Sequence, residues 1–225
     1  PVWISAHRGA MRFAPENTLA AYEKAAELGS NYVEVDVRTT RDGALVIMHD
    51  ARVDRTTDGR GAVAESTLAE IKRLRPAVPT FAETLRWGKR RGVRIDIDDK
   101  AAEIEAIANE IRREGMAERV LIEGPRDRLV RFVGLLPGVD TMPKVTSAAD
   151  IADAAGSLRM RTVRLSLPQL ADPNYVKAAR KAGARIAVTI LGNRDTEQTM
   201  REVIRMGARL IETDYPEVAA RVRGL

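Results

Sequence analysis

Only two histidines occur in this 225-residue sequence, and both stand where acid and base chemistry is common. His7 directly follows a strand-like run in Ala6-His7-Arg8-Gly9, and His49 precedes an acid in Met48-His49-Asp50. A single histidine is as often structural as catalytic, but two at strand ends beside an Arg and an Asp suit proton transfer near neutral pH. We therefore interpret His7 and His49 as a catalytic pair. Arg8 can offer its planar fork to a phosphate.

Acidic side chains alternate with apolar ones in two further strand-like runs, YVEVDV and VRIDID. The alternation places Glu34 and Asp36 on one face of the first run, and Asp96 and Asp98 on one face of the second. In a barrel strand the apolar face packs under the helices, so these acids would point into the barrel. An open antiparallel strand with its acids in water is the alternative. Inward carboxylates are costly unless a cation or a shared proton compensates them.

One divalent cation, Mg2+ or Ca2+, would satisfy an all-oxygen set of ligands made of Glu34, Asp36 and Asp96. Zinc is less favoured, because the chain has no Cys and the two histidines suit acid and base roles better. A carboxylate network without metal remains the alternative. Arg164 would also point inward if its neighbours Val163 and Leu165 pack outward.

The elements that must position these residues are eight short β-branched runs, which alternate with longer amphipathic stretches. This order predicts βα units on a parallel sheet. The helical stretches include residues 17–28 and 101–114, each followed by a glycine that can end a helix. Eight repeats in 225 residues predict a small TIM (β/α)8 barrel, with a doubly wound open sheet as the alternative. The strands are expected at 3–6, 32–37, 93–98, 119–123, 139–142, 162–165, 185–190 and 210–213.

The connection after the second strand is unusually long, and we treat residues 38–78 as an insertion. It contains a hairpin-like piece at 43–48, a turn-rich loop at 54–61 and a short helix at 67–74. An insertion on a βα loop lies at the C-terminal face of a barrel, where active sites of this fold are found. We expect one domain over residues 1–225.

Composition narrows the class of protein. Hydrophobic residues make up 44% and charged residues 31%, and no apolar run reaches membrane-spanning length. The absence of Cys excludes disulfides and thiolate sites and leaves the compartment open. Although the formal charge is +5, basic residues are scattered among nearly as many acids, which favours a solvated surface over a nucleic-acid partner. Nothing in the sequence indicates an oligomeric state.

The motifs resemble, in kind and order, those of the glycerophosphodiester phosphodiesterase family. The resemblance is dense over about the first 75 residues, and the set is far more specific than any one string. The matching segments are His7-Arg8-Gly9, Pro15-Glu16-Asn17-Thr18, Glu34-Val35-Asp36, His49-Asp50, Arg55-Thr56-Thr57-Asp58-Gly59 and Thr213-Asp214-Tyr215-Pro216.

The resemblance implies a TIM barrel with a small insertion, and metal-dependent cleavage of a small glycerol-linked phosphodiester into sn-glycerol 3-phosphate and an alcohol. It gives His7 and His49 the acid and base roles and makes Arg8 the phosphate clamp. The metal ligands would be Glu34, Asp36 and Asp96. Two rival readings are a barrel phospholipase or lyase that releases a cyclic phosphate, and a non-catalytic binding protein on the same fold.

Departures from the family pattern concern the substrate. Asp96-Ile97-Asp98 stands where the family has Glu-Ile-Lys, so Asp98 would replace a cation, which Lys100 or Lys144 could restore. We expect Asp98, Lys144 and Arg164 to bind substrate together with Arg8. A Glu-Gly-Pro at 123–125 in place of Ser-Phe, and Val-Thr-Ile-Leu at 188–191 in place of Trp-Thr-Val-Asn, predict a changed alcohol pocket.

Overall fold

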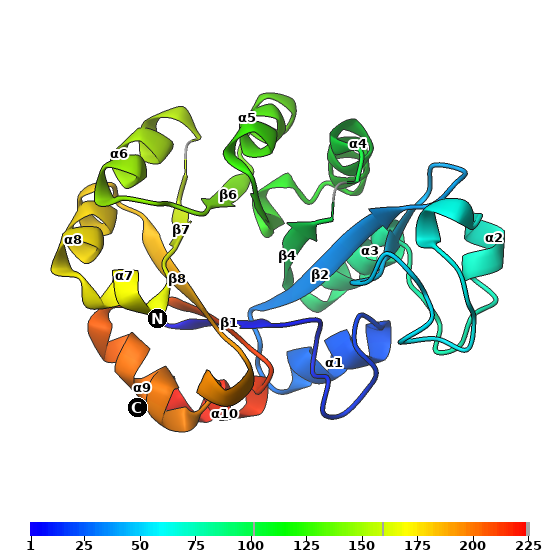
Figure 1. Cartoon of the computed structure of the whole chain (residues 1–225), viewed down its shortest axis with the longest axis horizontal. Coiled ribbons are helices and arrows are strands. Elements are labelled where there is room, and N and C mark those ends of the chain that lie inside the picture. The colour runs from blue at the N-terminus through cyan, green and yellow to red at the C-terminus, as the bar shows by residue number, and fades with distance from the viewer. Residues whose placement is uncertain (101, 159, 224–225) are drawn as a thin grey trace.

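The computed structural model describes residues 1–100, 102–158 and 160–223. Eight parallel strands follow one another around a ring in the order β6-β5-β4-β2-β1-β9-β8-β7, with helices outside them (Figure 1). Within the described residues, the backbones of β6 and β7 pair only at an isolated bridge between Lys144 and Arg164, which nearly closes the ring. The TIM barrel prediction is confirmed, and each strand lies within two residues of its expected limits. The strands are β1 (Trp3–Ala6), β2 (Tyr32–Thr39), β4 (Arg94–Asp99), β5 (Val120–Gly124), β6 (Asp140–Pro143), β7 (Thr162–Arg164), β8 (Arg185–Ile190) and β9 (Leu210–Thr213).

The two helical stretches expected at 17–28 and 101–114 are present with shorter limits, the first as Leu19–Glu27. Thr18 caps the first helix by accepting a hydrogen bond from Ala21 N, and Gly115 ends another in the left-handed conformation with φ 67°. The helix expected from residue 101 is described from Ile104 onward, and residue 101 lies outside the described residues. The helices around the barrel are α1 (Leu19–Glu27), α3 (Phe81–Arg91), α4 (Ile104–Glu114), α5 (Arg126–Leu135), α6 (Ala148–Ser157), α7 (Leu167–Ala171), α8 (Pro173–Lys181), α9 (Glu197–Met206) and α10 (Pro216–Val222), with short 3-10 turns η2 (Ala117–Arg119) and η3 (Gly192–Arg194).

The insertion after β2 folds around an apolar cluster of its own. Strand β3 (Leu45–Ile47) pairs antiparallel with the end of β2, as the hairpin-like pattern predicted. A 3-10 turn, η1 (Val63–Glu65), and helix α2 (Leu68–Ile71) follow, and α2 is shorter than the stretch 67–74 that was expected. Figure 1 shows this part standing out at one side of the barrel. The buried side chains of its cluster are Val46, Met48, Val53, Val63, Ile71 and Val78.

Alternation along the strands separates an apolar outer face from a layered interior. On β2, Val33, Val35 and Val37 are fully buried in the main core under the helices. Inside the barrel, a small apolar cluster lies two residues before the acids along several strands, for example Tyr32 before Glu34 and Leu210 before Glu212. The interior therefore has an apolar floor at the N-terminal ends of the strands and a polar layer above it.

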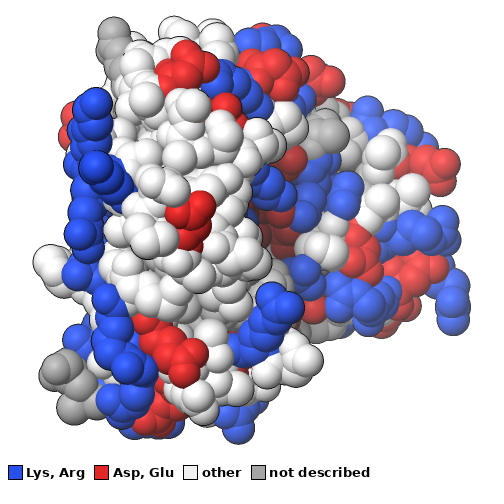
Figure 2. All heavy atoms as spheres, turned by 60° about the vertical axis from the view of Figure 1, so that its left-hand side comes forward, with Lys and Arg blue, Asp and Glu red and all other residues white. Residues whose placement is uncertain are grey.

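The N-terminal end of the barrel is rich in arginine. Within the described residues, these arginines donate hydrogen bonds to backbone carbonyls or hydroxyls rather than to carboxylates, as Arg94 does to Glu118 O at 2.7 Å. Arg185 also lies 3.9 Å above the Trp3 ring. Figure 2 shows a row of Lys and Arg along one edge, and acidic and basic side chains together around a hollow. Five arginines begin or directly precede strands: Arg94, Arg119, Arg161, Arg185 and Arg209.

None of the described helices combines the length and the apolar character that a membrane crossing requires.

Candidate active site

Carboxylates form two storeys at the C-terminal half of the barrel. The register of β2 and β4 pairs Glu34 with Asp96 and Asp36 with Asp98, so the second pair lies nearer the opening. Glu34, Asp36 and Asp96 are all at most 2% exposed, whereas the Asp98 side chain is 32% exposed. The inward direction predicted for these acids is thus what the strand geometry gives.

Three acids, Glu34 of the lower storey and Asp36 and Asp98 of the upper one, lie close enough to share a cation. Ligand atoms of Glu34, Asp36 and Asp98 all lie within 4.8 Å of one another. A second such group contains His7, Glu34 and Glu212. Asp96 belongs to neither group. Within the described residues, the structure therefore unites Glu34 and Asp36 as expected but places Asp98, rather than Asp96, beside them.

The barrel interior holds more carboxylates than cationic side chains, which fits a bound divalent cation. Burial raises the pKa of Glu34 well above its usual range, and the neighbouring charge of Asp36 raises it further. Oxygen ligands from three carboxylates are what Mg2+ or Ca2+ prefers. The carboxylates are Glu34, Asp36, Asp96, Asp98, Glu123 and Glu212, and the nearby cations are Arg8, Lys100 and Arg164.

Lys100 supplies a positive charge beside Asp98, as the sequence analysis allowed for this strand. Its Nζ lies 3.3 Å from Asp36 Oδ1 and also donates a hydrogen bond to Asp98. The negative charge that Asp98 brings to the inward face is therefore balanced by a lysine two residues later.

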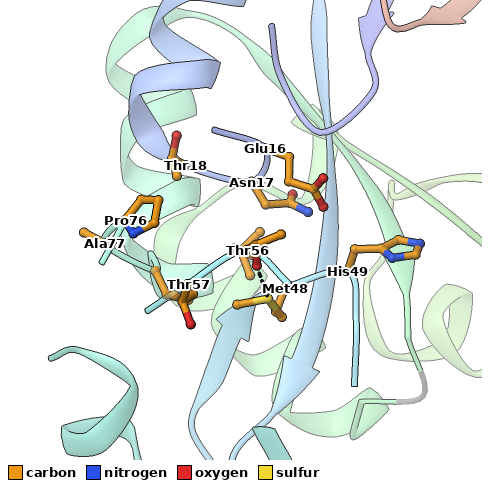
Figure 3. Close-up of a pocket in the computed structure, with 11 residues that line it drawn as sticks. Glu16, Asn17, Thr18, Met48, His49, Thr56, Thr57, Pro76 and Ala77 are labelled. Carbon is orange, nitrogen blue, oxygen red and sulfur yellow. Dashed lines mark hydrogen bonds between the residues drawn. The ribbon is translucent and has the colours of Figure 1, made fainter. Parts of the chain in front are cut away.

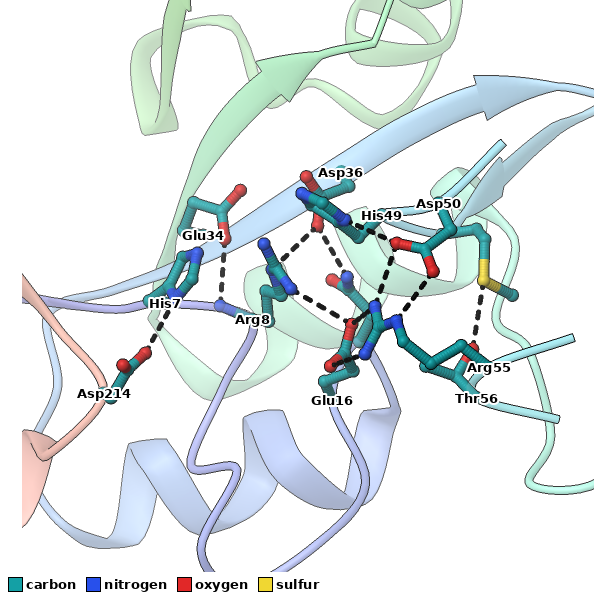
Figure 4. A network of polar contacts seen from close by, with 12 residues as sticks. His7, Arg8, Glu16, Glu34, Asp36, His49, Asp50, Arg55, Thr56 and Asp214 are labelled. Atoms are coloured by element: carbon teal, nitrogen blue, oxygen red, sulfur yellow. Dashed lines mark hydrogen bonds and ion pairs between the residues drawn. The ribbon is translucent and has the colours of Figure 1, made fainter. Parts of the chain in front are cut away.

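The two histidines are anchored in the same way. His7 Nδ1 lies 2.7 Å from Asp214 Oδ1, and His49 Nδ1 lies 2.7 Å from Asp50 Oδ1 (Figure 4). An ionised carboxylate can only accept a hydrogen bond, so each Nδ1 donates and each Nε2 is left for other partners. Both imidazoles are thereby prepared for proton transfer through Nε2.

A tight turn presents Arg8 at the mouth of the barrel. Gly9 has φ 88°, and a Cβ there would lie 2.8 Å from the Cβ of Ala21, so only glycine fits. The backbone N–H of Arg8 donates to Glu34 Oε2 at 2.9 Å, and its Nη1 donates to Glu16 Oε1 at 3.3 Å. Its Nε lies 3.5 Å from Asp36 Oδ2. The guanidinium is therefore held beside the acids of the upper storey.

Arg164 and Lys144 were both expected to bind substrate, but Arg164 is held by carboxylates whereas Lys144 is exposed. Arg164 Nη1 lies 2.5 Å from Glu123 Oε2, and its Nη2 donates to Glu212 Oε2 at 2.6 Å. Because both Nη atoms of Arg164 are paired with carboxylates, its side chain contributes to the floor of the barrel opening. Lys144 is exposed, and both residues line two adjoining cavities of about 250 and 420 Å³, the smaller of which reaches Asp98.

A narrow crevice beside His49 lies between the start of α1 and the insertion (Figure 3). Glu16 and Asn17 line one side, and Met48 and Thr56 line the other. Its volume of about 10 Å³ accommodates roughly one water molecule. The crevice is therefore too small to hold a phosphodiester.

Several side chains of the site were missed by the sequence analysis. Asp214 lies 207 positions from His7, but β9 pairs with β1, and the Thr213-Asp214 motif was the available signal. Asn17 donates to Asp36 Oδ2 at 2.7 Å and accepts from Tyr22 OH at 2.8 Å. The Pro-Glu-Asn-Thr motif pointed to this residue without indicating its partner.

Asp96 is expected to make the metal-free protein sensitive to pH. Its Oδ2 accepts a hydrogen bond from Ser5 Oγ at 3.0 Å, while its buried Oδ1 has no partner within the described residues. Burial, together with the charge of Glu212, raises the pKa of Asp96 to about 7. The folded state therefore holds the proton more tightly than the unfolded state, and stability should fall as pH rises from about 4 through about 7, by on the order of 4 kcal/mol.

Urea unfolding of the EDTA-treated protein tests this expectation. Asp96→Asn should be more stable than the original protein near pH 8, and the difference should shrink towards pH 4. A difference that stays constant with pH would show that Asp96 is not the group responsible.

Comparisons with known proteins agree with one another and together cover most of the chain. The sequence model of the "Glycerophosphoryl diester phosphodiesterase family" matches residues 7–127. A glycerophosphodiester phosphodiesterase of Caldanaerobacter subterraneus subsp. tengcongensis is 30% identical, over 95% of this chain and 94% of that protein. A crystal structure of glycerophosphodiester phosphodiesterase from Agrobacterium tumefaciens superposes with a TM-score of 0.88 at 28% identity, covering 98% of this chain and 100% of that one. The fold is also shared with an Oleispira antarctica phosphodiesterase solved with the product sn-glycerol-3-phosphate, with a TM-score of 0.83 at 22% identity, covering 99% of this chain and 97% of that one.

Proposed function

The chain belongs to the glycerophosphoryl diester phosphodiesterase family and is a phosphoric diester hydrolase, and we propose that it depends on a divalent cation and releases sn-glycerol 3-phosphate. The observation that carries this proposal is the meeting of two carboxylate-anchored histidines, Arg8 and the Glu34-Asp36-Asp98 cluster at one end of the barrel. The product named for the Oleispira antarctica relative supports the same outcome. We further propose that residues 1–225 form one catalytic domain, because every group in the site comes from the barrel or its insertion.

Binding of the phosphoryl group is assigned to the cationic side chains of the mouth. Arg8 can direct its N–H groups at two phosphoryl oxygens. Lys100 keeps Asp36 and Asp98 close together and adds positive charge beside them. A cation held by Glu34, Asp36 and Asp98 would neutralise negative charge that develops on the phosphoryl oxygens. We propose that Lys144, at the rim of the two cavities, contacts the alcohol part of the substrate.

Proton transfer is assigned to the two histidines. One imidazole removes the proton from the hydroxyl of glycerol next to the diester, and that oxygen attacks phosphorus. The P–O bond to the alcohol breaks, and the other imidazole protonates the departing oxygen. Water then opens the cyclic phosphate by the reverse use of the same pair, which leaves sn-glycerol 3-phosphate. Asp50 and Asp214 stabilise whichever imidazolium forms.

Hydrolysis of glycerophosphocholine tests the proposal. We expect release of choline and sn-glycerol 3-phosphate, loss of turnover with EDTA, and recovery when Mg2+, Ca2+ or Mn2+ is added. Accumulation of a stable cyclic phosphate would instead identify a lyase. Ligand binding without turnover of any diester would identify a binding protein. Full turnover in EDTA would contradict the dependence on metal.

A further inference from the structure

Arg55 joins two loops that carry different parts of the site. It lies in the insertion, in the turn-rich loop at 54–61, and its side chain is 48% exposed. Its Nε and Nη2 donate to the two carboxylate oxygens of Asp50 at 2.6 and 3.0 Å. Its Nη1 and Nη2 donate to the two oxygens of Glu16 at 2.8 and 2.7 Å. Arg55 thus makes a bidentate contact along each of two edges of the guanidinium (Figure 4).

Each carboxylate held by Arg55 contacts a residue that we place in catalysis. Asp50 accepts a hydrogen bond from Nδ1 of His49, and Glu16 accepts one from Nη1 of Arg8. Two chains of contacts therefore start at one guanidinium. One runs through Asp50 to the imidazole, and the other runs through Glu16 to the phosphate clamp.

The His49 backbone is held by Arg38 rather than by Arg55. The effect of Arg55 is therefore limited to the side chains. Arg38 Nε donates to the carbonyl oxygens of Met48 and His49 at 3.1 and 3.0 Å. These bonds fix the main chain but leave the imidazole free to rotate about its side-chain torsions. Asp50 is 30% exposed and would rotate as well without a second partner.

We propose that Arg55 is a positioning residue that fixes the His49 imidazole through Asp50 and the Arg8 guanidinium through Glu16. The inference rests on the proposed function of His49 and Arg8. A lysine could not replace this contact, because an ammonium group offers three donors at one point and no planar fork. The insertion therefore supplies a catalytic histidine and also the arginine that orients Glu16 on the loop before α1.

Kinetics of Arg55→Ala and Arg55→Lys test the inference. Both should lower kcat by about 10- to 100-fold, the range found when the hydrogen-bond partner of a metal-bound histidine is removed. The matched control is Arg52→Ala, which removes an exposed arginine of the same insertion that pairs with Asp54. Guanidinium ion at millimolar concentration should restore part of the activity of Arg55→Ala, because the site is open to solvent, whereas methylammonium should not. Turnover in Arg55→Ala or Arg55→Lys equal to that of Arg52→Ala would overturn the inference.

A double-mutant cycle with Asp50→Asn examines the route of action. If Arg55 acts through Asp50, Arg55→Ala should cost much less in the Asp50→Asn protein than in the original one. Independent, multiplicative losses would refute this route.

Imidazole ¹⁵N spectra give a readout that needs no turnover. The chain has two histidines, so their signals are readily separated. His49 should carry its proton on Nδ1 in the original protein and show mixed tautomers in Arg55→Ala, with His7 unchanged. An unchanged His49 tautomer would overturn the inference even in a fully active enzyme. A shift in tautomer in a protein without diesterase activity would uphold the inference while the proposed function fails.

Discussion

His7→Ala is expected to lower kcat on a glycerophosphodiester by on the order of 10³-fold. Removing the imidazole deletes one of the two groups that we propose move protons, and general acid or base catalysis contributes about 10²- to 10⁴-fold in enzymes. His7 lies at the end of β1 with its side chain 14% exposed, and the apolar core does not depend on its ring. Steady-state rates should therefore fall while the far-UV circular dichroism and the melting temperature stay close to those of the original protein.

Asp214 provides the control for this prediction. Asp214→Asn should lower kcat less than His7→Ala, because the imidazole remains but loses the partner of its Nδ1. Added to His7→Ala, the second change should cost nothing more, since the two residues act as a unit. Turnover that survives His7→Ala, or losses that multiply in the double variant, would show that His7 does not have the assigned role.

Asp98→Asn is expected to weaken binding of Mg2+, Ca2+ or Mn2+ by about 10²-fold and to reduce turnover in parallel. The change removes one of the three charged ligands proposed in the Glu34-Asp36-Asp98 cluster, and the affinity of such sites follows the number of charged ligands. Asp96→Asn makes the same chemical change two residues earlier on the same face of β4. It should alter metal affinity by less than about tenfold.

Calorimetric titration of metal into EDTA-treated protein measures both affinities without relying on activity. Saturating metal should restore part of the turnover of Asp98→Asn. A larger loss of metal affinity in Asp96→Asn than in Asp98→Asn would identify Asp96, rather than Asp98, as the third metal ligand.

The contrast between Asp96 and Asp98 marks the limit of what the sequence could predict. Period-two alternation identified the strand and the inward face, because both follow from the pleat of a single chain. It could not decide which of two acids on that face lies level with Asp36. That depends on the register with β2, which pairs Asp36 with Asp98 and is set by packing across the barrel.

Contacts between distant segments were predictable only in outline. The expected barrel implied that its last strand adjoins its first, yet it did not state that Asp214 would reach His7. Arg164 was expected to face inward, but Glu123 and Glu212, which occupy its fork, come from two other strands. The bond from Arg55 to Glu16 joins two loops, and no hydrophobic periodicity governs loop side chains.

The seam between β6 and β7 is the place where we expect the barrel wall to open most easily. Elsewhere, neighbouring strands share ladders of main-chain hydrogen bonds, whereas within the described part of the chain this pair shares a single bridge, between Lys144 and Arg164. Asp140 assists from below by accepting hydrogen bonds from Arg161 N and Thr162 Oγ1. Local opening costs least where the fewest backbone bonds break, and the two cavities assigned to the alcohol adjoin this seam. We therefore expect amide protons at this seam to exchange sooner than those of the other strand pairs, and bulkier alcohols to be admitted by widening of the same wall.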